Sequence, residues 1–321
     1  MSYPDLEAHV RGTSRYIDDM PDPAGLLHAA AVTSPVPHAK LGSIDTGPAL
    51  ASPGVVAVFT AADIPGANQI GGIIQDEELF AASTVHFIGQ PVAVVVAETS
   101  HQARAGAAAC ALELEELPAI FDAREAAAAG ELITASRTLE TGDVDAAWAE
   151  CDVIVEGTTE TAGQEHLYLE TQAALAIPEE GGRIKLWSST QAPTAVQRIA
   201  ARVLALPMNL VEVEVTRLGG AFGGKEDQAT PWAVMAALAA QKTGRPVRLT
   251  LNRHEDMRFT GKRHPYSSDF KIGLTSDGTI VAYEVQLWQN AGAAADLSPA
   301  ILERSLFHAT GSYFVPNARI H

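Results

Sequence analysis

The chain has 321 residues, a length that accommodates two domains, each with its own hydrophobic core. With 47% hydrophobic and 19% charged residues, its composition is that of a globular protein. The formal net charge of -17 repels nucleic acid and anionic lipid, which argues against both as general partners.

The cysteines and the apolar segments bear on the compartment. Cys110 and Cys151 show neither C-x-x-C nor zinc-like spacing, and no disulfide framework is indicated, which fits a reducing compartment. The first residues lack a charged leader followed by an apolar run, and no segment approaches the ~20 apolar residues that span a bilayer. These features predict a soluble, cytoplasmic protein with no membrane contact.

The first third of the chain predicts a compact α+β unit. Short apolar runs indicate strands, and an Ala-rich segment after the N-cap candidate Thr99 indicates a helix. The strands are expected at 29–36, 55–60, 91–98 and 112–117, and the helix at 101–111. The run 91–98 is apolar on both faces, which is typical of a fully buried strand. We assign residues 8–122 to this first domain.

The weakly patterned segment 123–150 predicts a linker with a short helix around 143–149. A second domain is expected over 151–321, beginning with a strand at 151–156. Its further strands are expected at 173–177, 184–188, 211–217, 247–251 and 280–289, and its helices at 192–204 and 231–242. Gly244 is a helix-ending glycine, and residues 276–278 predict a hairpin turn.

Residues 219–226, called here the glycine loop, contain four glycines around one aromatic residue, Phe222. Glycines let a backbone approach a ligand closely or adopt conformations closed to other residues. The pattern G-x-x-x-x-G-K fits a phosphate loop, but Glu226 stands where a Ser or Thr hydroxyl would hold Mg²⁺, and the dinucleotide fingerprint G-x-G-x-x-G is not present. The structural alternative is a tight strand-to-helix turn without a ligand, although four glycines exceed what such a turn requires.

The glycine loop, with Arg217 before it, resembles that of the molybdenum hydroxylases, the xanthine dehydrogenase and aldehyde oxidase family. Other segments resemble blocks of the same family, in family order along nearly the whole chain. They are residues 10–19 and 89–93 in its hammerhead domain, and residues 163–171, 188–191, 253–257 and 260–265 in its molybdopterin-binding domain. The resemblance implies an α+β fold: a small α/β hammerhead domain followed by the first part of a molybdopterin-binding α+β domain.

Members of this family hydroxylate an electron-poor carbon with oxygen taken from water, at a molybdenum ion bound by molybdopterin. Such a cofactor needs little direct protein ligation, and the protein orients it by hydrogen bonds. The resemblance implies that Gln191 hydrogen-bonds an oxo group of the metal and that the backbone at Phe222 and Gly223 passes beside the cofactor. Gln191 and Phe222 would thus lie next to molybdenum without ligating it. The alternatives are a turn-stabilising role for Gln191 and a core position for Phe222.

Two charged positions bear on the substrate. Glu226 and Arg304 match positions where xanthine dehydrogenases carry a glutamate and an arginine that face the purine. A carboxyl group can bind ring nitrogens, and a guanidinium stabilises negative charge that builds on the ring oxygen. The resemblance therefore implies hypoxanthine or xanthine as substrate, in purine catabolism. An aldehyde oxidase-type hydroxylase of other aldehydes or N-heterocycles stays open, as do a helix-start acid for Glu226 and a surface charge for Arg304.

Other polar residues are expected to have structural roles. His166, His254, His264 and His308 show no metal-ligand spacing such as H-E-x-x-H. Tyr168 and Glu170 are expected to be core and hydrogen-bonding residues.

The family's second glycine-rich loop and its general-base glutamate lie beyond the position that matches His321, so no catalytic residue is assigned in this chain. Cysteine clusters for iron–sulfur centres and a flavin segment are also missing, and the resemblance implies that 2Fe-2S clusters and FAD sit on a partner subunit of a hetero-oligomer. We expect an N-terminal fragment of a longer subunit, inactive alone. A complete polypeptide whose other half is a separate chain, or a non-catalytic assembly module, is the alternative. The choice between NAD and oxygen as acceptor belongs to the flavin side.

Overall fold

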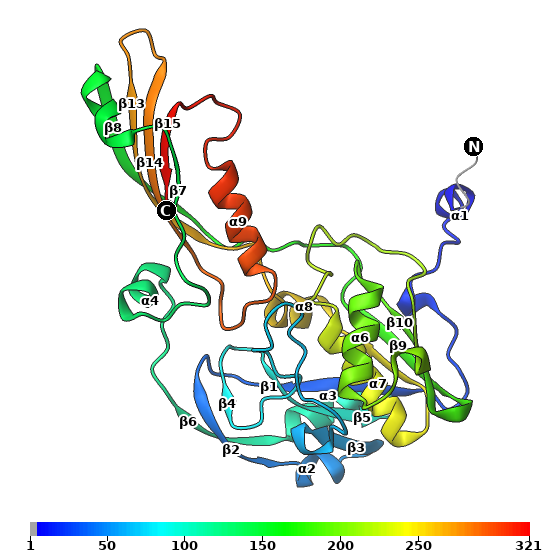
Figure 1. Ribbon diagram of the computed structural model, residues 1–321. Coiled ribbons are helices and arrows are strands. Elements are labelled where there is room, and N and C mark those ends of the chain that lie inside the picture. Colours follow the sequence, from blue (N-terminus) through cyan, green and yellow to red (C-terminus); the bar gives the residue numbers. More distant parts are fainter. Residues whose placement is uncertain (1–4) are drawn as a thin grey trace. The chain divides into compact units, whose positions relative to one another are not determined.

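The computed structural model describes residues 5–321 (Figure 1). They form two compact units, each built from two separate stretches of the chain. Unit 1 comprises Met1–Pro118 and His166–Gly261, and unit 2 comprises Ala119–Glu165 and Lys262–His321. Both units combine sheets with helices, which confirms the predicted α+β class. Within residues 5–321, no helix is long and apolar enough to cross a bilayer.

Unit 1 contains a seven-stranded sheet, in the order β11-β10-β9-β12-β1-β5-β3, and a three-stranded sheet, in the order β4-β2-β6. The strands are β1 (Leu27–Thr33), β2 (Ala39–Asp45), β3 (Val55–Thr60), β4 (Thr84–Val85), β5 (Pro91–Ala97), β6 (Ala111–Glu116), β9 (Ala173–Glu179), β10 (Arg183–Ser188), β11 (Val211–Glu214) and β12 (Val247–Thr250). β1 pairs in parallel with β12 and antiparallel with β5. Segments from distant parts of the sequence therefore share one sheet.

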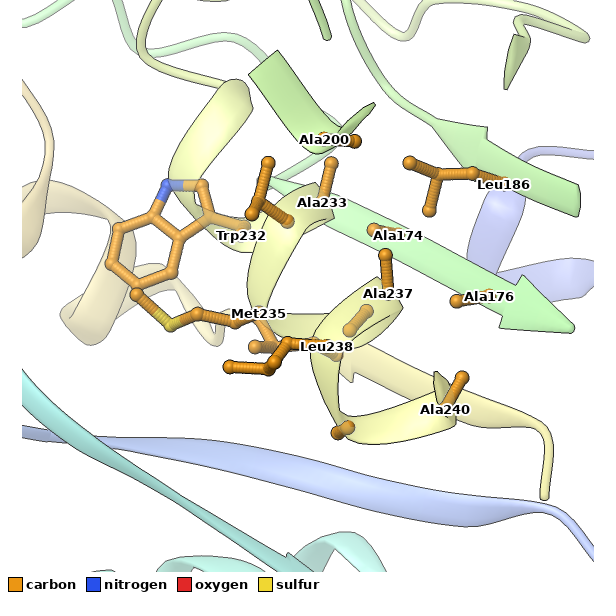
Figure 2. Close-up of a cluster of buried hydrophobic side chains, with 14 of the residues drawn as sticks. Ala174, Ala176, Leu186, Ala200, Trp232, Ala233, Met235, Ala237, Leu238 and Ala240 are labelled. Carbon is orange, nitrogen blue, oxygen red and sulfur yellow. The ribbon is translucent and has the colours of Figure 1, made fainter. Parts of the chain in front are cut away.

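Unit 1 also contains helices, several of which pack against these sheets. They are α1 (Leu6–Val10), α2 (Gly47–Leu50), α3 (Ser100–Ala109), α6 (Pro193–Val203), α7 (Thr230–Thr243) and α8 (Arg253–Phe259). α7 contacts β9, β10 and β12 as well as α6, so every residue from 230 to 240 is buried. Figure 2 shows Ala233 and Ala237 of this helix near Ala174 and Ala176 of β9. Small side chains on both elements allow the helix to pack close to the sheet.

Two large side chains near the start of α7 hold this end of the helix in place. Trp232 and Met235 project together from α7 in Figure 2, and both are buried. The Trp232 ring stacks on Phe259 of α8, with ring centroids 6.3 Å apart. Because only residues 227–229 separate the glycine loop from α7, this packing holds the segment that follows the loop.

Unit 2 is built on a five-stranded sheet in the order β7-β15-β14-β13-β8. Its strands are β7 (Leu139–Thr141), β8 (Val153–Thr161), β13 (Tyr266–Leu274), β14 (Ile280–Gln289) and β15 (Asn317–Ile320), and its helices are α4 (Ala123–Ala129), α5 (Val144–Ala147) and α9 (Ser298–His308). β13 and β14 form the predicted hairpin, and Gly278 in its turn has a φ of 87°. A small cluster of buried residues, including Val285 and Leu306, forms the core under α9.

Several local predictions are confirmed. β5 is buried at every position, as its two apolar faces indicated. The Thr99 hydroxyl caps α3 by accepting a hydrogen bond from the backbone N–H of Gln102 at 3.2 Å. Gly244 ends α7 with a left-handed φ of 66°.

Other elements differ from the sequence-based expectation. β1 ends at Thr33 rather than residue 36, because Pro35 and Pro37 follow and cannot donate to the sheet. The expected linker 123–150 contains the predicted short helix, α5, but also α4 and β7, which were not expected, and β7 pairs antiparallel with β15. α8 and α9 were not predicted as helices, although Asn252 and Glu255 form a capping box at the start of α8.

Candidate cofactor-binding site

The glycine loop leads from β11 toward α7 in unit 1. Its backbone has a positive φ at Gly220 (93°), Phe222 (57°) and Gly223 (91°). This conformation is strained for a residue with a side chain, and Phe222 adopts it while 63% exposed. Phe222 is therefore not a core residue, whereas Ala221, Gly224 and Lys225 of the same loop are buried.

Two glycines of the loop are required for packing inside unit 1. A Cβ on Gly219 would lie 2.4 Å from Cβ of Glu170, and a Cβ on Gly224 would lie 2.7 Å from the His166 ring. A Cβ on Gly223 would meet no atom within 4 Å. The close approach that the glycines predicted is thus internal at Gly219 and Gly224, whereas Gly223 borders open space that a ligand can enter.

Gln191, which follows β10, is hydrogen-bonded to the glycine loop. Its backbone N–H donates to the Lys225 carbonyl at 2.8 Å. Its side-chain Oε1 accepts hydrogen bonds from the N–H groups of Gly223, at 3.2 Å, and Lys225, at 3.3 Å. The side chain is exposed, and its Nε2 group makes no hydrogen bond to the part of the chain that the structure describes. The amide NH₂ is therefore available to donate to a ligand.

A buried ion pair lies beneath the loop. Lys225 is completely buried, and its Nζ donates to the Glu170 carbonyl (2.7 Å), to Ser189 Oγ (2.7 Å) and to Glu170 Oε2 (3.3 Å). Glu170 Oε2 also accepts from Ser189 Oγ and from the Gly219 N–H, both at 2.8 Å. Burial lowers the pKa of the Lys225 ammonium, and the charge of Glu170 partly offsets that effect. Because its amine is turned inward, Lys225 cannot serve as the lysine of a phosphate loop.

A second layer of buried polar groups supports this ion pair. Lys225 Nζ lies 4.4 Å from the centroid of the Tyr168 ring. Gln172 Nε2 donates to the Tyr168 hydroxyl and to the Gly224 carbonyl, both at 3.0 Å. The Gln172 N–H donates to Asp256 Oδ2 at 2.7 Å, and burial raises the pKa of that carboxyl group. Tyr168 is thus a buried hydrogen-bonding residue, with its phenol pKa raised by burial and by the Asp256 charge.

The two expected substrate residues belong to different units. Glu226, at the end of the glycine loop, is half-buried in unit 1. Arg304 is exposed on α9 of unit 2. Within residues 5–321, neither side chain forms a hydrogen bond or an ion pair with another residue. Both charged groups are therefore available to a ligand.

The histidines considered for a metal site have separate surroundings. In unit 1, His166 packs beside Tyr168, with ring centroids 6.5 Å apart, and His254 is exposed on α8. In unit 2, His264 Nε2 is 2.8 Å from Ser298 Oγ, and His308 is exposed at the end of α9. Among the described residues, no three His, Cys, Asp or Glu side chains gather as metal ligands.

The sequence did not reveal Lys225 as a structural centre of the site, because a lysine beside glycines fits a phosphate loop equally well. Arg253 was also missed: its Nη2 donates to the carbonyls of Tyr168 and Leu169, at 2.6 and 2.8 Å. The sequence signal that could have revealed it is the capping box at the start of α8, which predicts a helix that begins at this arginine.

The residues of unit 1 fit a molybdenum cofactor bound through hydrogen bonds. Gln191 offers an unused amide donor, its oxygen is satisfied by the loop, and Gly223 next to it borders open space. The exposed residue Phe222 adjoins the same donor, since Gly223 is its neighbour in the chain. This set supplies orientation and hydrogen bonds rather than direct ligands, as a metal already bound by an organic cofactor requires.

Comparisons with known proteins support molybdopterin as the cofactor. Residues 11–118 match the family described as the aldehyde oxidase and xanthine dehydrogenase a/b hammerhead domain, and residues 127–321 match the molybdopterin cofactor-binding domain. Xanthine dehydrogenase from Oryza sativa subsp. japonica is 42% identical over 97% of this chain, and xanthine dehydrogenase/oxidase from Mus musculus is 42% identical over 96%. The chain spans 23% of the length of each relative.

Solved structures of two oxidoreductases also match this chain. Aldehyde oxidoreductase from Desulfovibrio gigas matches 99% of this chain with a TM-score of 0.92 and 30% identity, over 37% of its own length. Quinoline 2-oxidoreductase from Pseudomonas putida 86 matches 100% with a TM-score of 0.86 and 27% identity, over 43% of its own length. The resemblance found in the sequence is confirmed: the chain belongs to the molybdopterin cofactor-binding domain family of aldehyde oxidases and xanthine dehydrogenases, and it carries their hammerhead domain.

Proposed function

We propose that this chain is part of a molybdenum-dependent hydroxylase that oxidises a purine, hypoxanthine or xanthine, with water as the oxygen source. The observation that carries the proposal is Glu226, which ends the glycine loop with a half-buried carboxylate that no other described residue uses. A carboxylate kept free beside a cofactor loop is suited to accept hydrogen bonds from ring N–H groups. The relatives named xanthine dehydrogenase, 42% identical to this chain, support the same substrate class.

Each residue of the proposed site has a separate task. The molybdenum cofactor supplies the metal-centred oxygen transfer and accepts the electrons. Gln191 Nε2 would donate a hydrogen bond to the bound cofactor, and the backbone at Phe222 and Gly223 would border it. Glu226 binds the purine ring nitrogens. Arg304 stabilises the negative charge that develops on the ring oxygen during attack, since a guanidinium is always protonated.

The proposal places further machinery outside residues 1–321. The general base, the 2Fe-2S clusters and FAD would belong to the rest of the enzyme, with the clusters and flavin on a partner subunit of a hetero-oligomer. The chain covers 23% of the length of the xanthine dehydrogenase relative from Oryza sativa subsp. japonica. We therefore expect the isolated chain to turn over no purine. Bound molybdenum with hypoxanthine turnover in the purified chain would contradict this expectation, and a complete enzyme that folds but binds no molybdenum would favour a non-catalytic assembly module.

A hydroxylase of aldehydes or other N-heterocycles is the second candidate, favoured by the TM-score of 0.92 to an aldehyde oxidoreductase. The Glu226→Val variant of the complete enzyme separates the two candidates. Loss of the carboxylate should lower kcat/KM for hypoxanthine and xanthine about 100-fold, as removal of a preorganised hydrogen-bonding group does. Turnover of benzaldehyde should change little.

The matched control is Glu180→Val, which removes an exposed carboxylate from the β9–β10 turn. It should leave the kinetics of every substrate unchanged. Purine turnover that is unchanged in Glu226→Val would reject the role of Glu226 in purine binding, and a wild-type enzyme that oxidises aldehydes but no purine would establish the second candidate.

A further inference from the structure

Both the side chain and the backbone of Lys225 are held by hydrogen bonds. Its ammonium group uses all three of its donors inside unit 1, on the Glu170 carbonyl, Glu170 Oε2 and Ser189 Oγ. Its backbone is bound to Gln191: the Lys225 carbonyl accepts from the Gln191 N–H at 2.8 Å, and the Lys225 N–H donates to Gln191 Oε1 at 3.3 Å. A displacement of the lysine side chain is therefore transmitted to the Gln191 amide.

The partners of Lys225 are themselves joined by hydrogen bonds. The Gly219 N–H and Ser189 Oγ both bind the same Glu170 oxygen that receives Lys225 Nζ. The Thr190 hydroxyl donates to the Lys225 carbonyl at 3.1 Å. One buried lysine thus joins three segments: the glycine loop, the turn after β10 and the segment around Glu170.

We propose that Lys225 is a positioning residue: anchored through its ammonium group to Glu170 and Ser189, it sets the direction in which Gln191 Nε2 faces the molybdenum cofactor. Without that anchor, the carbonyl of residue 225 would shift. The Gln191 side chain would then no longer be held with Oε1 toward the loop and Nε2 toward the cofactor. The inference deepens the cofactor-binding part of the proposed function. It does not depend on which substrate the enzyme oxidises.

The test uses the complete enzyme that contains this chain, with the cofactor loaded. Lys225→Met removes the ammonium group but leaves the Glu170 carboxylate buried, so the double variant Lys225→Met/Glu170→Gln removes both charges and allows folding to be separated from positioning. The controls are Lys185→Met and Lys185→Met/Glu212→Gln. Lys185 on β10 also forms ion pairs, with Glu212 at 3.2 Å and Glu214 at 3.3 Å, and both of these partners lie on β11, outside the glycine loop.

Two readouts report on the cofactor without purine turnover. One is the rate at which molybdenum is lost during dialysis against a chelator. The other is the electron paramagnetic resonance spectrum of enzyme partly reduced with dithionite, which responds to hydrogen bonds at the metal. The double variant should unfold at nearly the wild-type temperature, yet lose molybdenum about 10 to 100 times faster, as loss of partners around metal sites does, and give shifted spectral parameters. Both Lys185 variants should match the wild type.

A folded double variant with wild-type molybdenum retention and an unchanged spectrum would overturn the proposal, because Lys225 would then serve only as a charge partner for Glu170. If neither Lys225 variant folds, Ser189→Ala decides, since it removes one acceptor and keeps the ion pair. A shifted spectrum in Ser189→Ala supports the proposal, and an unchanged one rejects it. An enzyme without purine activity but with these shifts would reject the purine substrate and leave the role of Lys225 intact.

Discussion

Both units tie distant segments together with charged side chains, but they do so in different surroundings. In unit 1, Lys225 is completely buried against Glu170, whose side chain is 11% exposed. In unit 2, Arg319 on β15 forms ion pairs with Glu140 on β7, Asp145 on α5 and Glu284 on β14, and those carboxylates are exposed to water. A buried charge depends on its few partners, whereas water can replace the partners of an exposed one. The number of ion pairs is thus a poor guide to their contribution.

The largest expected effect is that of Lys225→Met on stability. The substitution leaves a buried carboxylate without its cation, which costs about 3–5 kcal/mol of the free energy of unfolding. Urea denaturation followed by tryptophan fluorescence measures the loss. The control Lys185→Met, in a partly exposed ion pair, should cost less than about 1 kcal/mol. Equal losses in the two variants would contradict the distinction between buried and exposed pairs.

The next effect comes from the glycine loop. Gly219→Ala would place a Cβ 2.4 Å from Cβ of Glu170, and such overpacking costs about 1–3 kcal/mol. In the unit 2 hairpin, Gly278→Ala meets no atom within 4 Å, so only its positive φ opposes the change, at about 1–2 kcal/mol. The two variants should also differ in molybdenum content, with a loss only in Gly219→Ala. A normal metal content in Gly219→Ala would show that the loop tolerates displacement from Glu170.

A smaller effect should accompany acidification, and it should occur in both units. Burial lowers the pKa of His28 on β1 and of His264 in unit 2 below the value of 6.5 that the unfolded chain shows. Since the unfolded state then binds more protons than the native state, stability is present above about pH 6.5 and falls as the pH drops below it. Thermal unfolding measured between pH 8 and pH 5 checks this direction. His28→Gln and His264→Gln should each make the decline less steep, and an unchanged slope in both would contradict the assignment.

The smallest effect is expected for Arg319→Met. Its ion pairs lie at the surface of unit 2, so the loss of stability should be well below that of Lys225→Met. In 1 M salt, where the screening length is about 3 Å, the difference between wild type and Arg319→Met should nearly vanish. The effect of Lys225→Met should persist in the same salt. A salt-independent Arg319 effect would place that side chain among the buried pairs instead.

Local patterns in the sequence predicted much of the fold. β5, α7 and the β13–β14 hairpin each carry their own signal, in an apolar run, a terminal glycine or a turn sequence. The pairing of β1 with β12 could not be predicted, because neither strand encodes its partner. β7 was missed for the same reason, since three residues become a strand only beside β15.

The site was predicted unevenly. Gln191, Phe222 and Gly223 were identified by resemblance, and the structure brings them together in unit 1. Their roles toward the cofactor, like those of Glu226 and Arg304 toward a substrate, stay predictions. The buried pair of Lys225 and Glu170 was hidden, because the sequence gives a charge but not the depth at which it lies.

The pairing of β1 with β12 also constrains the order of folding. Its partners Ala29 and Leu249 stand about 220 residues apart, and synthesis at about 5–20 residues per second needs roughly 10–45 s to make that stretch. During this interval the apolar edge of β1 lacks its neighbour and is open to wrong pairing. We therefore expect the nascent chain to depend on chaperones until the polypeptide through β12 has left the ribosome.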